Sequence, residues 1–158
     1  MTAAVRMKVE RLITLVVEDD DSDFQLFEAA FRRTPGDVQL HRVDDGESAV
    51  AYLAGDGTFS DRSRYPLPHI ILLDIKLPRR SGLEVLQWVR QQPGLCRVPV
   101  IMLTSSRHTK DVNRAYEKGV SAYFSKPETM KELTDLLGAL KDVWTRWFEF
   151  PSLDDKAN

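Results

Sequence analysis

Three short, predominantly apolar runs lie along the chain. These runs cover residues 12–17, 69–73 and 98–103 and are rich in leucine, isoleucine and valine. Runs of this length and composition are typical of strands that are buried on both faces of a parallel sheet. Weaker strand patterns cover residues 38–43 and 122–124. The pattern therefore predicts five strands.

Amphipathic segments separate the strands. In the first of them, Phe24, Phe27 and Phe31 recur at helical spacing. Strands that alternate with helices along a chain predict parallel pairing, with helices on both faces of the sheet. We therefore expect a doubly wound α/β fold made of five strand–helix units. The other expected helices have similar apolar patterns and cover residues 47–53, 83–89, 111–117 and 128–148.

Two segments depart from the regular alternation. Residues 55–68 combine Gly, Asp, Ser, Arg and Pro, so we expect a long, exposed and mobile loop. The last helix is long for one that only covers a sheet, and we expect Trp144 and Trp147 near its end to project from the domain and form a dimer interface. The expected domain spans residues 10–148, and residues 149–158 form a polar C-terminal tail.

Composition and charge narrow the functional classes. A chain of 158 residues with 42% apolar residues is long enough for one domain with its own core. Lysine and arginine total 22 against 24 acidic residues and form no dense basic stripe, so we expect no nucleic-acid partner. The lone Cys96, the lack of an apolar run of roughly 18 residues and the polar N-terminus favour a cytoplasmic protein without membrane contact.

Polar residues capable of phosphate chemistry follow four of the predicted strands. Parallel sheets bind ligands outside the carboxyl ends of their strands, so these residues should meet at one edge. They are Glu18, Asp19, Asp20 and Asp21 after the first strand, Asp74 after the third, Thr104 and Ser105 after the fourth, and Lys126 after the fifth.

Crowded carboxylates repel one another unless a cation compensates their charge. Magnesium prefers oxygen ligands and commonly uses one or two carboxylates together with phosphate oxygens. Asp19 and Asp74 suit direct coordination of Mg²⁺ or Mn²⁺, and Glu18 suits coordination directly or through water. Lys126 supplies a compact positive charge, and the hydroxyl of Thr104 can donate to a phosphoryl oxygen. The set indicates a phosphoryl site.

Four sequence blocks carry a family resemblance. The strings LVVEDDDSD, ILLDIKLPRRSG, VIMLTSS and AYFSKP, in this order, are similar to the motif blocks of the response-regulator receiver family. The resemblance implies a flavodoxin-like fold with strand order 2-1-3-4-5 and no enzyme in the ordinary sense: a phosphoacceptor that catalyses its own phosphorylation and slow dephosphorylation.

The resemblance also assigns roles to residues. Asp74 is the implied phosphoacceptor, Glu18 and Asp19 are the acidic pair, and Lys126 is the lysine salt-bridged to the site. The metal ligands implied are Glu18, Asp19, Asp74 and the backbone carbonyl of Lys76. The implied switch residues are Thr104 and Tyr123, and the implied Lys126–Pro127 peptide bond is cis.

A subgroup is also suggested. The string EDDDSD, the long loop before the third strand and the aromatic ending VWTRWFEFP resemble stand-alone receivers that partner phytochrome-type histidine kinases. This implies a histidine kinase partner and a homodimer formed through the fourth helix, fifth strand and fifth helix. The expected function is that of a single-domain response regulator, which signals through conformational change and dimerisation.

Plainer interpretations stand beside these assignments. Taken singly, Asp74 is a turn or capping residue as readily as an acceptor, and Tyr123 is an ordinary packing residue. Asp21 and Asp23 are best explained as solvated or helix-capping acids, while the role of Asp20 stays open.

Other functional classes share part of the pattern. A haloacid-dehalogenase-like phosphohydrolase would need a second acid two residues after Asp74, where Lys76 stands. A pseudo-receiver scaffold would not need the complete set of Asp19, Asp74, Thr104 and Lys126. A flavodoxin-like cofactor carrier would want Ser, Thr and Gly after the first strand instead of acids.

Overall fold

The computed structural model describes residues 11–153. Its central sheet is parallel, with strand order β2-β1-β3-β4-β5. The strands are β1 (Leu12–Val17), β2 (Val38–Val43), β3 (Ile70–Leu73), β4 (Val100–Thr104) and β5 (Ala122–Ser125). The helices are α1 (Asp21–Arg32), α2 (Gly46–Ala54), the short 3₁₀ helix η1 (Gly57–Ser60), α3 (Gly82–Gln91), α4 (Thr109–Glu117) and α5 (Met130–Arg146).

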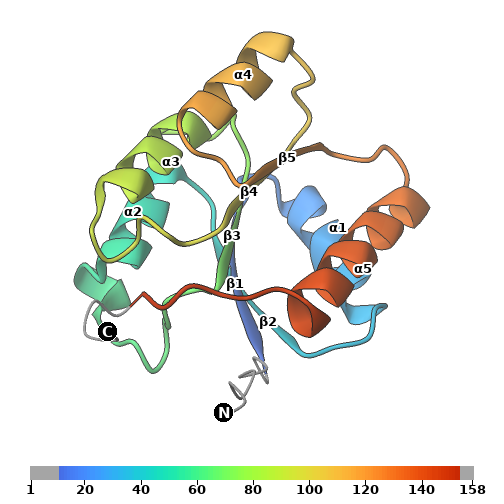
Figure 1. The fold of residues 1–158 in the computed structure, drawn as a ribbon, viewed down its shortest axis with the longest axis horizontal. Coiled ribbons are helices and arrows are strands. Elements are labelled where there is room, and N and C mark those ends of the chain that lie inside the picture. Colours follow the sequence, from blue (N-terminus) through green and yellow to red (C-terminus); the bar gives the residue numbers. More distant parts are fainter. Residues whose placement is uncertain (1–10, 154–158) are drawn as a thin grey trace, which may run out of the picture.

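The apolar runs lie at the centre of this sheet. Every residue of β3 and β4 is buried, because helices cover both faces. On one face α2, α3 and α4 pack over the sheet, and on the other α1 and α5 do so (Figure 1). The doubly wound fold and its strand order are confirmed. Among the described residues, no helix is both long and apolar enough to cross a bilayer.

Side-chain caps set where the helices begin. Asp20 caps α1 by accepting from the backbone N–H of Asp23 at 2.8 Å, and Asp45 caps α2 by accepting from Ser48 at 2.7 Å. Ser81 and Glu84 form a capping box at the start of α3. These caps satisfy otherwise unpaired N–H groups and stabilise the loops at the carboxyl edge of the sheet.

The segment 55–68 is more ordered in its contacts than its composition suggests. It contains η1, and Arg62 donates to the carbonyls of Tyr52 and Leu53 at 2.7 and 2.9 Å. The ring of Tyr52 contacts those of Phe59 and Tyr65, with centroids 5.3 and 6.0 Å apart. More than half of the segment is exposed, as expected, but aromatic packing and the half-buried guanidinium of Arg62 hold it against α2. Its expected mobility stays a prediction.

The end of α5 also differs from expectation. Trp144 is only 4% exposed and belongs to the core, whereas Trp147 is 60% exposed. Placing Trp144 on a dimer surface was wrong for a physical reason. The buried residues Leu133, Leu137 and Trp144 recur at helical spacing, so Trp144 lies on the core face of the helix. The role expected of Trp147 stays a prediction.

The chain beyond α5 returns to the sheet. Residues 148–153 cross the amino-terminal edge of the strands toward α2 (Figure 1). The ring of Phe150 lies 5.5 Å from that of His69, and Leu153 packs against the core. Packing thus continues past residue 148, where the sequence predicts a polar tail. Residue 10 and residues 154–158 lie outside the described residues.

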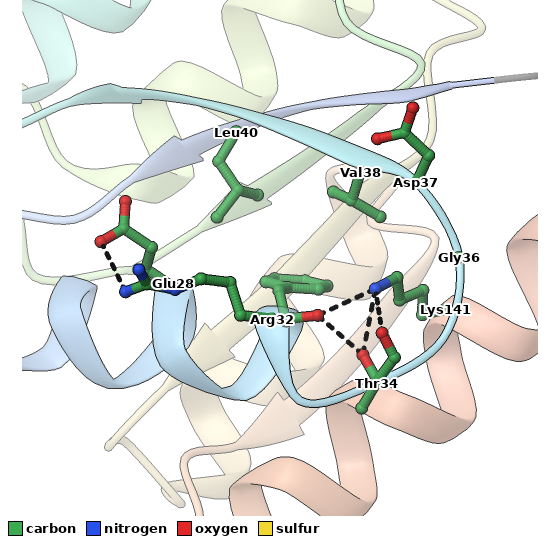
Figure 2. Close-up of a pocket in the computed structure, with 9 residues that line it drawn as sticks. Glu28, Arg32, Thr34, Gly36, Asp37, Val38, Leu40 and Lys141 are labelled. Atoms are coloured by element: carbon green, nitrogen blue, oxygen red, sulfur yellow. Dashed lines mark hydrogen bonds and ion pairs between the residues drawn. The ribbon is translucent and has the colours of Figure 1, made fainter.

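A cavity of about 330 Å³ lies between α1, the start of β2 and α5. Figure 2 shows the ammonium of Lys141 at its edge, donating to the carbonyls of Phe31 and Thr34 at 2.8 Å each and to the Thr34 hydroxyl at 3.1 Å. A lysine near a helix C-terminus satisfies carbonyls that lack partners within the helix. Lys141 therefore joins α5 to the end of α1.

Candidate functional site

The carboxyl ends of four strands bring the predicted site residues together. Glu18 follows β1, Asp74 follows β3, Thr104 ends β4 and Lys126 follows β5. Backbone hydrogen bonds continue past the strands, from Asp74 N–H to the Val17 carbonyl at 3.2 Å and from Lys126 N–H to the Thr104 carbonyl at 2.8 Å. The parallel register therefore holds these side chains at one edge.

Asp74 lies at the centre of this edge and is only 6% exposed. Its Oδ1 accepts from the Thr104 hydroxyl at 2.7 Å, and its Oδ2 accepts from Lys126 Nζ at 2.9 Å. The backbone N–H of Lys76 lies 3.4 Å from Oδ1. Thr104 at the end of β4, Lys126 just after β5 and Lys76 in the loop after β3 thus contact the carboxylate oxygens of Asp74.

Lys126 connects the site through three carboxylates. Its Nζ lies 2.8 Å from Glu18 Oε2, 2.8 Å from Asp23 Oδ2 and 2.9 Å from Asp74 Oδ2. Burial by itself lowers the pKa of Lys126, but hydrogen bonds to the three acids outweigh it and raise the pKa above its usual range. The side chain is therefore a fixed positive charge.

An acidic cluster lies beside this ammonium. Glu18, Asp19 and Asp74 each place an oxygen within 4.8 Å of the others. Burial raises the pKa of Glu18 to about 7, and the neighbouring charge of Asp74 adds to this rise, while Lys126 opposes it. Oxygen donors crowded at one partly buried point fit a hard divalent cation, which would relieve their repulsion.

The acids of the first loop divide into different roles. Asp20, left open by the sequence, caps α1. Asp21 pairs with Arg42 at 2.7 Å. Interpreting Asp23 as a solvated or capping acid was wrong, because it contacts Lys126 and so belongs to the site. Its position three residues after the N-cap could have revealed it, since the first helical turn rises from the edge where the lysine ends.

Tyr123 and Thr104 are linked through Ser106. The Tyr123 hydroxyl donates to the Ser106 carbonyl at 2.9 Å, and the Ser106 N–H lies 3.4 Å from Thr104 Oγ1. The Ser106 hydroxyl donates to Asp111 of α4 at 2.5 Å. A displacement of Thr104 would therefore change the position of Ser106, and with it the contacts that Ser106 makes with Tyr123 and with Asp111 of α4.

The remaining backbone features frame the site. Within residues 11–153 no peptide bond is cis, so the Lys126–Pro127 bond is trans. The expectation of a cis bond was wrong, and trans is the isomer that most X–Pro bonds adopt because it is lower in energy. Lys76 is exposed, and coordination by its backbone carbonyl stays a prediction. At Gly82 an added Cβ would lie 2.0 Å from the Asp74 carbonyl oxygen, so α3 begins in direct contact with the site.

Comparison with known proteins connects this geometry to a family. A family profile described as the response regulator receiver domain matches residues 14–138, which include every site residue discussed above. The chain belongs to the response regulator receiver family. The receiver carries its acidic cluster, central aspartate, hydroxyl and lysine at the strand ends where the motif blocks placed them.

Individual relatives give the same result. The receiver is 33% identical to the response regulator Rcp1 of Synechocystis over 140 residues, which cover 89% of this chain and 93% of Rcp1. A crystal structure of Rcp1 in its Mn²⁺-bound form has a TM-score of 0.80, with 33% identity, 89% of this chain covered and 99% of that one.

A second relative is known in a phosphorylated form. The phosphorylated cyanobacterial phytochrome response regulator RcpA has a TM-score of 0.83 and 29% identity to the receiver, with 90% of this chain and 99% of that chain covered. The resemblance to phytochrome response regulators inferred from the sequence is thus confirmed.

Proposed function

We propose that the receiver accepts a phosphoryl group on Asp74, with Mg²⁺ or Mn²⁺ bound at Glu18, Asp19 and Asp74. The observation that carries the proposal is the convergence of Thr104 and Lys126 on the two oxygens of one buried carboxylate, beside two further acids. The phosphorylated form of RcpA and the Mn²⁺-bound form of Rcp1 support it.

In the proposed reaction a carboxylate oxygen of Asp74 attacks the phosphorus of a phosphohistidine. The phosphorus–nitrogen bond breaks, the electron pair leaves with the imidazole, and an acyl phosphate forms on Asp74. Lys126 Nζ lies 2.9 Å from the attacking carboxylate and neutralises charge on the transferred oxygens. A bound divalent cation would supply further charge neutralisation. Slow hydrolysis of the acyl phosphate then restores Asp74.

The signal is proposed to leave through Thr104 and Tyr123. A phosphoryl oxygen on Asp74 competes for the Thr104 hydroxyl, which donates to Asp74 at 2.7 Å in the unmodified protein. Movement of Thr104 changes its contact with Ser106, whose carbonyl holds the Tyr123 hydroxyl. The surface formed by α4, β5 and α5 thereby acquires two states with different affinities for partners.

The proposed partners are a histidine kinase and a second copy of this chain. The relationship to Rcp1 and RcpA favours a phytochrome-type photoreceptor kinase. For the homodimer we propose the outer face of α5 and the residue that follows it, where Val143 is 46% and Trp147 60% exposed. We also propose a cytoplasmic location, because a histidine kinase takes its phosphoryl group from ATP.

The test uses a small phosphodonor, which removes the need to know the kinase. Purified wild-type protein is incubated with acetyl phosphate and Mg²⁺, and the intact mass is measured. We expect one added phosphoryl group, which is absent when EDTA removes the metal and absent in Asp74→Asn. The matched control is Asp56→Asn, which removes an exposed carboxylate away from the site and should behave like wild type.

The outcomes also separate the competing functions. A protein that keeps the fold only as a scaffold would stay unmodified in every condition. A phosphohydrolase would consume the donor continuously without accumulating a modified form. Equal modification of wild type and Asp74→Asn would reject Asp74 as the acceptor.

A further inference from the structure

Arg42 extends from the end of β2 to the loop that carries two acids of the site. Its Nε donates to the carbonyl of Glu18 at 3.1 Å, and its guanidinium pairs with Asp21 Oδ1 at 2.7 Å. Asp19 lies between these two anchor points in the chain. One side chain thus holds the loop both before and after a predicted metal ligand.

The guanidinium is itself held in place. It lies over the ring of Phe24, 4.9 Å from the centroid, and the Arg42 side chain is 23% exposed. The next residue, Val43, accepts from the backbone N–H of Glu18 at 3.1 Å. The two final residues of β2 therefore bind both backbone polar groups of Glu18, whose side chain is 1% exposed.

We propose that Arg42 is a positioning residue for the cation site, an inference that rests on the proposed function. The guanidinium places Nε at the Glu18 carbonyl, where it donates a hydrogen bond, and at the same time places Nη2 in an ion pair with the exposed Asp21 carboxylate. The single ammonium of a lysine does not reproduce these two separate contacts. By fixing Glu18 and Asp21, Arg42 holds Asp19 close enough to Glu18 and Asp74 for all three to share one ion.

Substituting Arg42 should change the affinity for the metal in opposite directions, depending on whether the side chain positions the ligands or acts only through its charge. A positive charge near a cation site repels the ion, so loss of the Arg42 charge alone would strengthen metal binding. Loss of positioning would weaken it instead. Partners that orient metal ligands typically contribute roughly 10-fold or more to metal affinity. We therefore expect Arg42→Gln to weaken Mn²⁺ binding about 10-fold.

The measurement is the equilibrium affinity for Mn²⁺, with free ion quantified by electron paramagnetic resonance. Arg42→Lys keeps the charge but cannot make both the Nε hydrogen bond and the Nη2 ion pair, and we expect it to weaken Mn²⁺ binding as Arg42→Gln does. Wild-type affinity in Arg42→Lys, or unchanged or tighter binding in Arg42→Gln, would overturn the inference.

Two further variants test the ring beneath the guanidinium and control for the change in net charge. Phe24→Leu removes the ring under the guanidinium without changing charge, and we expect weaker Mn²⁺ binding; unchanged affinity counts against the proposal. Arg32→Gln changes the charge equally at an exposed arginine of α1 that pairs with Glu28, and this variant should bind Mn²⁺ like wild type. Thermal unfolding in EDTA confirms that each variant is folded; if Arg42→Gln is not, Arg42→Lys and Phe24→Leu decide.

The same experiment separates this inference from the proposed function. If wild type itself binds no Mn²⁺, the metal-dependent phosphoacceptor proposal fails. If wild type binds Mn²⁺ and all Arg42 and Phe24 variants bind equally well, only the positioning role fails.

Discussion

At the scale of single residues, the site is a balance between one ammonium and several carboxylates. Lys126 contacts Glu18, Asp23 and Asp74, while Asp19 adds a further negative charge beside them. Like charges gathered this closely oppose folding in the absence of a cation, because their repulsion exists only in the folded state. The arrangement that allows the site to bind a metal and a phosphoryl group therefore lowers the folding stability of the metal-free protein.

We predict that Asp19→Asn reverses its effect on stability when metal is added. In EDTA the variant should be more stable than wild type by roughly 1 kcal/mol, because one repelling charge is gone. At saturating Mg²⁺ it should be the less stable protein, because wild type gains more from binding the ion. Urea unfolding in both conditions measures this, with Asp56→Asn as the control; a variant that is less stable in EDTA contradicts the account.

His69, which lies away from the site, makes a contribution to folding stability that depends on pH. The backbone N–H of Ile13 donates to His69 Nδ1 at 2.9 Å, so that nitrogen must be unprotonated. Burial lowers the pKa of His69 below its usual 6.5. A base with a lowered folded-state pKa adds stability above its unfolded-state pKa and loses it as the pH falls below that value.

We predict that the change of folding stability with pH depends on His69. Wild type should lose stability as the pH falls from 7 to 5, and His69→Ala should lose less over the same range. At pH 7.5 the variant should be less stable by about 1–3 kcal/mol, since the Ile13 N–H loses its acceptor. Parallel stability curves for the two proteins, measured by urea unfolding, would show that His69 does not contribute.

At the scale of elements, the apolar pattern predicted strands better than it predicted the ends of helices. The bounds of β1 and β2 match the expected ranges, although β1 is almost wholly buried and β2 is mostly half-buried. Helix starts depended on caps such as Thr129 and Ser81, which are set by local hydrogen bonds. Asp23 was missed because its partner Lys126 is far away in sequence, and only its place in the first turn of α1, at the edge where the lysine lies, pointed to that contact.

Trp144 near the end of α5 and Trp147 just after it differ in burial, because Trp144 lies on the core face of the helix whereas Trp147 follows its end. Trp144 follows Leu137 by seven residues, two turns of helix, and so returns to the same face. Counting the length of the helix suggested instead that both rings lie beyond the domain. Periodicity was the better guide, because a buried face continues for as long as there is a sheet or another helix beneath it.

We predict that Trp144→Ala costs about 3–5 kcal/mol of folding stability, because it removes a large core side chain and leaves a cavity. Trp147→Ala should change the stability of the monomer by less than about 0.5 kcal/mol, as exposed substitutions usually do. Chemical denaturation at low protein concentration compares them. Similar losses in both variants would contradict the burial described for α5.

At the scale of the whole molecule, topology explains why the site could be predicted at all. Parallel strands place their carboxyl ends at one edge, so residues as distant in sequence as Glu18 and Lys126 meet there. The strand order and the four motif blocks were enough to predict that these residues share one site. The return of Phe150 and Leu153 to the core was not predictable, because two apolar residues in a polar tail form no periodic pattern.

The exposed end of α5 leads to a prediction about assembly. If Trp147 lies in a homodimer interface, Trp147→Ala should lower the dimer fraction at a given concentration, because exposed aromatic anchors often dominate such contacts. Sedimentation velocity measures this with the protein in its phosphorylated and unphosphorylated forms. Leu26→Ala, at a 43% exposed leucine of α1, is the control. An unchanged dimer fraction in Trp147→Ala would remove this surface from the interface.

The most direct test of the central claim is to locate the phosphoryl group chemically. An acyl phosphate is reduced by borohydride, which converts the modified aspartate to homoserine, and peptide mass analysis then identifies the residue. After treatment with acetyl phosphate and Mg²⁺, the account predicts homoserine at position 74 and nowhere else. Reduction at another acid of the cluster, such as Asp19 or Asp23, or a phosphoryl group that resists reduction, would contradict it.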